Sequence, residues 1–202
     1  MTQLDPTRPQ RTTRSQPLAR ALPSVLAALL ICLAAASLRG QSQPTEDDVK
    51  AAYLFNFSHF VRYPAPDPSA AKTFDICLIG RNDIVPTLQS VVQNETVNGQ
   101  PVRILQLDRA ADARPCAIAY MGSSEASRIE KDLAALEGSD ALTVSDVPRF
   151  TDRGGMIQFV LQNNRVRFTV NRSSAERARL TLSSELLKVA LAVTPAPPTE
   201  VQ

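Results

Sequence analysis

Phe74-Asp75-Ile76-Cys77-Leu78-Ile79-Gly80 is a short apolar run that ends at a glycine, as expected of a strand buried on both faces. Three similar runs follow along the chain, at residues 102–107, 117–121 and 141–144. Helix-forming sequence lies between them at residues 83–93 and again from Ser123 to Leu136. Apolar strands that alternate with helices indicate a mostly parallel sheet.

The sequence on either side of these runs predicts a helix before them and a hairpin and a helix after them. Thr45 is the expected N-cap of the first helix, which should end before Pro64. Near the C-terminus, residues 156–162 and 165–170 flank Asn163-Asn164, a two-residue hairpin signal, so we expect the sheet to end in an antiparallel pair. A final helix is expected to carry Leu186, Leu187, Ala190 and Leu191 as its apolar stripe. The predicted fold is α/β: a three-layer sandwich with a mostly parallel sheet and a C-terminal antiparallel hairpin.

The first 40 residues have the composition of a signal peptide. Four arginines precede an apolar run from Ala21 to Ala36, and small residues follow that run. The run is shorter than the roughly 20 apolar residues of a comfortable membrane span. We therefore expect residues 1–40 to be a signal peptide and the protein to be exported, with an uncleaved N-terminal anchor as the alternative.

Removal of this leader changes the charge of the protein. The whole chain has a formal net charge of +2, but beyond Arg39 it carries 17 Lys and Arg against 19 Asp and Glu, a net charge of −2. No basic run remains that could follow a phosphate backbone, so nucleic acid binding is disfavoured. Residues 45–193 then form one α/β domain, and residues 194–202 are expected to be a disordered, Pro-rich tail.

Two cysteines, Cys77 and Cys116, remain after the leader, which contains Cys32. An even number of cysteines in an exported chain favours a disulfide over a metal or redox site. Successive βαβ units commonly give the strand order 2-1-3, which places the strand of Cys77 beside the strand that Cys116 precedes. Such a bridge could stabilise the domain by about 3–4 kcal/mol. The alternative is two separate buried thiols.

Catalytic and metal sites are not indicated. The single histidine, His59, lies on an apolar helix, and no Gly-x-Ser-x-Gly sequence is present. The clustered His and Cys ligands of a zinc site are also absent from the sequence. Asp146 and Asp152 flank a turn, where acidic residues are common. We expect no catalytic residue, no metal and no cofactor, and hence a protein that is not an enzyme.

Several motifs, in order along the chain, resemble the YfiR-like family of exported regulators. The similarity covers about Asp48 to Ala192, and each motif alone is weak. The motifs are Val49–Phe57 with Phe60-Val61 and Pro64, Ile76–Gly80, Val97–Val102, Cys116, Leu142–Asp146, Phe150, Arg153–Ile157, Phe159-Val160, Asn164–Phe168 and Ser183–Leu187. The chain departs from the family pattern at Arg62-Tyr63, where many members carry an acid and a tryptophan.

The resemblance implies a periplasmic protein that binds the extracytoplasmic domain of a membrane signalling protein, either a diguanylate cyclase or a sensor kinase. In the best-known arrangement such a protein restrains a diguanylate cyclase, and a redox change can lift the restraint. The two family cysteines correspond to Cys77 and Cys116. Phe150 and Arg153 are candidates for the partner interface, with Phe150 expected to be exposed, and a homodimer is a further option.

A second class of function is a small-ligand sensor or carrier without catalytic activity. Ligands of open α/β sheets bind outside the carboxyl ends of the strands. The candidate ligand-binding residues are those in the loops at these ends: Arg81, Asn82, Ser123, Ser124, Ser145 and Asp146. These residue types are also ordinary turn and cap formers. A secreted enzyme of undefined chemistry is the weakest option.

Overall fold

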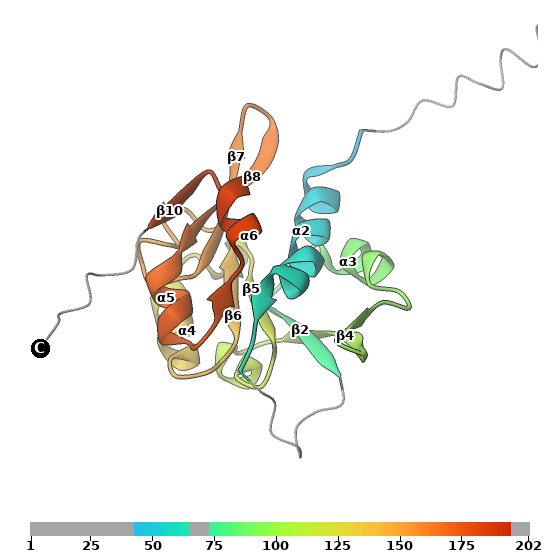
Figure 1. The fold of residues 1–202 in the computed structure, drawn as a ribbon, viewed down its shortest axis with the longest axis horizontal. Helices are drawn as coiled ribbons and strands as arrows, with labels where there is room; N and C mark the ends of the chain where they lie inside the picture. The colour runs from blue at the N-terminus through green and yellow to red at the C-terminus, as the bar shows by residue number, and fades with distance from the viewer. Residues whose placement is uncertain (1–42, 65–72, 195–202) are drawn as a thin grey trace, which may run out of the picture. The chain divides into compact units, whose positions relative to one another are not determined.

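The computed structural model describes residues 43–64 and 73–194, which form an α/β domain built on an eight-stranded sheet (Figure 1). Most strand pairs are parallel, and the antiparallel pairs are β3–β4 and β7–β8. The strands, in spatial order, are β3 (Thr96–Val97), β4 (Gln100–Leu107), β2 (Phe74–Ile79), β5 (Ile118–Met121), β6 (Leu142–Ser145), β7 (Ile157–Gln162), β8 (Arg165–Asn171) and β10 (Ala192–Thr194).

Helices cover both faces of this sheet and complete the three layers. Helices α2 (Glu46–Phe60), α3 (Val85–Val91), α5 (Arg172–Arg177) and α6 (Ser184–Val189) contribute to the core on one face. Helix α4 (Ile129–Leu136) and the 3₁₀ helix η2 (Ala110–Ala113) cover the other face. A two-stranded ladder of β1 (Val61–Arg62) and β9 (Thr181–Leu182) joins the end of α2 to the start of α6.

Strand β2 shows why the apolar runs form the centre of the sheet. All six of its residues are buried, because strands lie on both of its sides and helices on both of its faces. Ile76 and Leu78 face the core beneath α2, whereas Cys77 and Ile79 face the core beneath α4. This alternation follows from the two-residue period of a strand.

The two predicted local signals at the ends of the domain are confirmed. Thr45 caps α2 in a capping box, in which its hydroxyl accepts from the amide of Asp48 and the Asp48 carboxylate accepts from the amide of Thr45. Asn163 and Asn164 both have positive φ angles, 51° and 58°, as the tight β7–β8 turn requires.

Two predicted helices differ from the structure. The segment after Ser123 begins as a 3₁₀ turn, η3 (Ser123–Glu125), and α4 starts only at Ile129. Helix α6 is capped by Ser183, one of two neighbouring serines that could cap it, but it ends at Val189, so Ala190 and Leu191 lie outside it.

The end of the sheet also differs from the prediction. The chain continues into β10, which pairs in parallel with β8, so the sheet does not end in the antiparallel hairpin. Thr194, expected in the tail, is the last residue of β10. The predicted signal peptide (1–40), Cys32 and the rest of the predicted tail lie outside the described residues.

Candidate functional site

A polar cleft of about 860 Å³ lies at the carboxyl ends of β2 and β5 and is lined by the residue that follows β6. This is the edge at which open α/β sheets bind ligands. The cleft brings together residues from α2, from the β2–α3 loop, and from the loops after β5 and β6. They are Thr45, Glu46, Asp47, Lys50, Arg81, Asn82, Asp83, Ile84, Tyr120, Gly122, Ser123, Ser124 and Asp146.

Five of the six predicted ligand-binding residues therefore line one cleft, and Ser145 does not. Ser145 is fully buried, and its hydroxyl donates to the carbonyl of Met121 (2.6 Å) while accepting from the amide of Val147 (3.0 Å). Because both contacts fix the backbone around the end of β6, Ser145 has a structural role, and its assignment to the ligand site is wrong.

A buried lysine joins α2 to the loop after β6. The Lys50 Nζ atom lies 2.7 Å from Oδ2 of Asp146 and 2.7 Å from Oε1 of Glu46. Burial of Lys50 alone lowers its pKa, but hydrogen bonds and charge interactions with Asp146 and Glu46 outweigh burial, so the pKa is raised. Lys50 is therefore a charged, doubly paired link across a sequence separation of 96 residues.

Asp146 is the central acceptor of this cluster. Its second oxygen, Oδ1, is buried and accepts no hydrogen bond of normal geometry from the described residues. The buried Tyr120 hydroxyl interacts with the same carboxylate: burial, followed by the charge of Asp146, raises the Tyr120 pKa. A smaller cavity of about 170 Å³ continues from Asp146 and Lys50 towards Phe159 and Leu161 of the β7–β8 hairpin.

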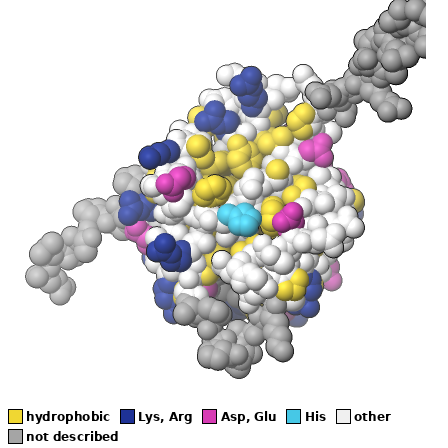
Figure 2. Space-filling view, turned by 45° about the vertical axis from the view of Figure 1, so that its right-hand side comes forward, with side chains coloured by type: hydrophobic (Ala, Val, Ile, Leu, Met, Phe, Trp, Pro, Cys, Tyr) yellow, Lys and Arg dark blue, Asp and Glu magenta, His cyan; other side chains and the backbone are white. Residues whose placement is uncertain are grey.

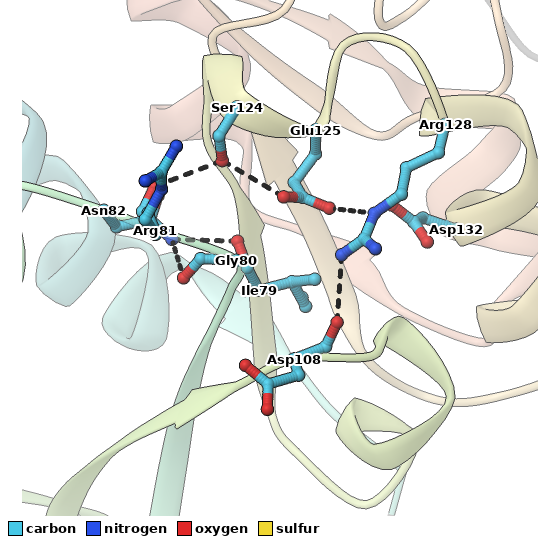
Figure 3. Close-up of polar contacts among 9 residues, drawn as sticks. All are labelled: Ile79, Gly80, Arg81, Asn82, Asp108, Ser124, Glu125, Arg128 and Asp132. Carbon is cyan, nitrogen blue, oxygen red and sulfur yellow. Dashed lines mark hydrogen bonds and ion pairs between the residues drawn. The ribbon is translucent and has the colours of Figure 1, made fainter.

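A second polar network holds one wall of the cleft (Figure 3). The Ser124 hydroxyl lies 3.2 Å from the carbonyl of Arg81 and 3.1 Å from Oε1 of Glu125. Glu125 is buried and pairs with Arg128, whose Nη2 donates to the carbonyl of Asp108 (2.9 Å). These contacts connect the ends of β2, β4 and β5 to the segment that precedes α4.

Gly80 allows this network to approach β2. Its φ angle is +75°, and a Cβ atom there would lie 2.0 Å from Oε1 of Glu125. Asn82 closes the same loop, since its side-chain amide donates to the carbonyls of Ile79 (2.8 Å) and Gly80 (3.2 Å). The loop is thus fixed internally, whereas the Arg81 side chain is exposed and makes no hydrogen bond or ion pair within the described residues.

The two candidate interface residues have different surroundings. Phe150 is fully buried in the core beneath α4 and packs against Gly155, so its expected exposure is wrong. The turn that carries it folds inward because the Phe150 carbonyl accepts hydrogen bonds from the amides of Arg153 and Gly155. Arg153 is partly exposed, and its Nε atom lies 3.6 Å from Oε1 of Glu130.

The predicted disulfide between Cys77 and Cys116 is confirmed. It joins the middle of β2 to the residues just before β5, with Cα atoms 6.1 Å apart. Both cysteines belong to the core beneath α4, and neither is more than 4% exposed. The bridge therefore ties together two strands that already pair in the centre of the sheet.

Other candidate groups do not converge on a reaction centre. His59 is exposed on α2, and its ring packs edge-on against Phe55 with centroids 5.0 Å apart. Among residues 43–64 and 73–194, no group of three or more His, Cys, Asp or Glu side chains could hold a metal ion. No helix within the same ranges is long and apolar enough to cross a membrane.

The sequence did not reveal the contribution of α2 to the cleft. Glu46 and Asp47 indicate an ordinary helix start, and Tyr120 lies in a run that predicts a buried strand. The available signal was Lys50, a cation directly beside the apolar residues that α2 buries and one turn after Glu46.

Comparisons with known proteins agree with this architecture. The profile of a protein family described as YfiR/HmsC-like matches residues 47–191. Among solved structures, a conserved domain protein from Vibrio cholerae O1 biovar El Tor strain N16961 is similar, with a TM-score of 0.53 and 11% sequence identity. The match covers 74% of this chain and 60% of the Vibrio chain, and at this identity it shows the fold alone. No curated protein matches the chain.

Proposed function

The chain belongs to the YfiR/HmsC-like family, and on that premise we propose that it is an exported regulator that restrains a membrane signalling enzyme. The enzyme we propose is a diguanylate cyclase, bound through its extracytoplasmic domain. The family match carries this proposal because it spans almost the whole described domain. The protein would act by binding, without catalysis of its own.

Export to the periplasm is supported by two features of the chain. The basic, then apolar N-terminal sequence has the layout of a secretory signal. The buried Cys77–Cys116 disulfide fits an oxidising compartment. N-terminal sequencing of the protein from its native host should place the mature start between Ala36 and Gln43, and a protein that begins at Met1 in the cytoplasm would contradict export.

Restraint of a cyclase requires a substantial interface. A binding protein controls a two-state enzyme only through different affinities for its active and inactive states. A shift from almost fully active to almost fully inactive needs about 5.5 kcal/mol of differential binding. A few solvent-exposed ion pairs cannot supply that difference, since each contributes about 0–1 kcal/mol.

Deletion of the gene tests the proposal. Loss of the regulator should raise cellular cyclic-di-GMP and biofilm, and expression of the exported domain should restore the original level. The same domain, purified and immobilised, should capture a membrane cyclase from solubilised membranes of the host. The proposal is contradicted if deletion leaves cyclic-di-GMP unchanged and the domain captures no signalling enzyme. Capture of a sensor kinase would identify the kinase, instead of a cyclase, as the partner.

The polar cleft supports a second function, the sensing of a small ligand. Its volume of about 860 Å³ lies within the usual range for ligand sites, and five loop residues chosen from the sequence line it. Thermal-shift screening against nucleotides and amino acids tests this function. A ligand of the cleft should raise the melting temperature of the wild-type domain and fail to do so for Arg81→Ala, whereas Arg109→Ala, an exposed arginine outside the cleft, should respond like wild type.

A further inference from the structure

Most of the large apolar side chains that the described residues expose lie at the end of α2 and around α6 and β10. Val189, Leu191 and Val193 are 57%, 40% and 37% exposed, and Phe60 is 39% exposed. The fifth such side chain, Leu161, lies on the β7–β8 hairpin. We refer to Val189, Leu191 and Val193 as the C-terminal apolar face. Single exposed apolar residues are common, but a local group of them marks an interaction site.

Backbone contacts fix α6 and the residues that follow it against the rest of the domain. The amide of Ser183, which caps α6, donates to the carbonyl of Phe60 (2.9 Å), and the amide of Leu191 donates to the carbonyl of Phe168 (2.8 Å). Val193 pairs in register with the buried Val170, so both side chains lie on the side of the sheet that α2 covers. Figure 2, which views the domain from the side of His59, shows apolar side chains gathered in a band.

The same region contains one edge of the sheet. Strand β10 is the last strand of the sheet and is paired on one side only. Its residues Ala192, Val193 and Thr194 are all exposed, and none of them is charged. Because β10 has only three residues, it offers little backbone for a further strand, as is usual for a protected sheet edge. The exposed apolar side chains, and not the free backbone of β10, are therefore the feature that favours a partner.

The charged side chains around this face are mainly basic. Lys188 precedes Val189, and the Arg167 guanidinium lies 3.5 Å from the carbonyl of Val189. Lys188 forms no ion pair within residues 43–64 and 73–194. The only acid of α6 is Glu185, in its first turn.

We propose that the C-terminal apolar face is the docking surface for the membrane partner, and that it binds a protein segment with apolar residues flanked by acidic ones. This inference rests on the proposed function, because it names the surface through which the restraint acts. The apolar side chains would supply the desolvated centre of the interface, and Arg167 and Lys188 would pair with acids at its rim.

The test uses exported variants of the whole protein in a strain that lacks the gene. Val189→Asp and Leu191→Asp place a charge at the centre of the face and should leave cyclic-di-GMP as high as in the deletion strain. Lys188→Glu should give an intermediate level. Ala134→Asp is the control: it adds the same charge at an exposed apolar residue of α4, outside both the face and the cleft, and should restore the wild-type level. Equal periplasmic amounts and unchanged melting temperatures establish that the variants fold.

The possible outcomes separate the surface from the function. If deletion raises cyclic-di-GMP and all four variants restore it, the regulatory function stands and the C-terminal apolar face is not the docking surface. If deletion has no effect on cyclic-di-GMP, the proposed function fails and the surface assignment falls with it. Sedimentation of the purified domain tests whether a second copy of the protein occupies the face. The assignment to a membrane partner is overturned if the domain is a dimer, if Val189→Asp and Leu191→Asp convert it to a monomer, and if strains with these variants keep a normal level of cyclic-di-GMP.

Discussion

Removal of the Cys77–Cys116 disulfide should strongly destabilise the domain. The two cysteines are 39 residues apart. Closure of a loop of that length lowers the chain entropy of the unfolded state, which stabilises the folded state by about 3.9 kcal/mol at 25 °C. In a domain of roughly 150 residues, a loss of 1 kcal/mol lowers the melting temperature by about 2–4 °C. The double variant Cys77→Ala/Cys116→Ala should therefore melt about 8–15 °C below the oxidised wild type.

The comparison with reduced protein isolates the contribution of the covalent bond. Both cysteines are buried, so alanine also removes two sulfur atoms from the core beneath α4. Thermal unfolding, followed by circular dichroism with and without reductant, separates these two effects. Reductant should lower the melting temperature of the wild type close to that of the double variant and leave the double variant unchanged. Two alkylatable thiols in the unreduced native protein, or a wild-type melting temperature insensitive to reductant, would refute the reasoning.

Substitutions at Lys50, Asp132 and Gly80 test other parts of the structure. Lys50→Met should lower the free energy of unfolding by roughly 2–4 kcal/mol in urea titrations, because it leaves two carboxylates without their shared cation. Folding raises the pKa of Lys50, so the stabilisation by Lys50 should be fully present below pH 10.5, the ordinary pKa of a lysine. It should be lost as the pH rises through the pKa of Lys50 in the folded protein. Burial raises the pKa of Asp132, so ionisation of Asp132 opposes folding at neutral pH. Asp132→Asn should therefore raise the melting temperature at pH 7. This gain should shrink as the pH falls towards 3.8, the ordinary pKa of an aspartate, because Asp132 of the folded protein then becomes protonated. Gly80→Ala should cost roughly 3 kcal/mol, because the new Cβ meets Glu125, whereas Gly138→Ala, with a φ of +73° but open space around it, should cost only about 1 kcal/mol in the same titration.

The centre of the fold could be predicted because its strands are buried on both faces. The runs at residues 74–79, 117–121 and 141–144 are apolar apart from Asp75 and Thr143, so their strand character depends little on distant context. Within the described residues, the C-terminal end of the domain has no strand that is buried on both faces in this way. The apolar spacing of α6 continues through Leu191, which predicts a longer helix, but the Leu191 amide bonds to β8 instead. A tertiary hydrogen bond thus overrides the local pattern.

The candidate site shows the same division between local and distant information. The loops after β2, β5 and β6 could be chosen from sequence, because the carboxyl ends of parallel strands meet at one edge. The pairing of Lys50 with Asp146 joins residues 96 positions apart, and no local pattern specifies it. Phe150 was misplaced for a related reason: it follows a turn, yet the carbonyl contacts of that turn direct its ring into the core.

Helix α2 runs from the polar cleft to the start of α6, the helix that leads into the C-terminal apolar face. Its first turns supply Glu46 and Lys50 to the cleft, and its last residue, Phe60, is bonded to the cap of α6. A helix of 15 residues is about 22 Å long and rigid enough to connect the two regions, but proximity alone does not establish coupling. A double-mutant cycle on partner affinity decides the question. If Lys50→Met and Val189→Asp act additively, within about 0.5 kcal/mol, the cleft and the face are independent; a larger interaction energy would mean that the cleft and the face are energetically coupled in partner binding.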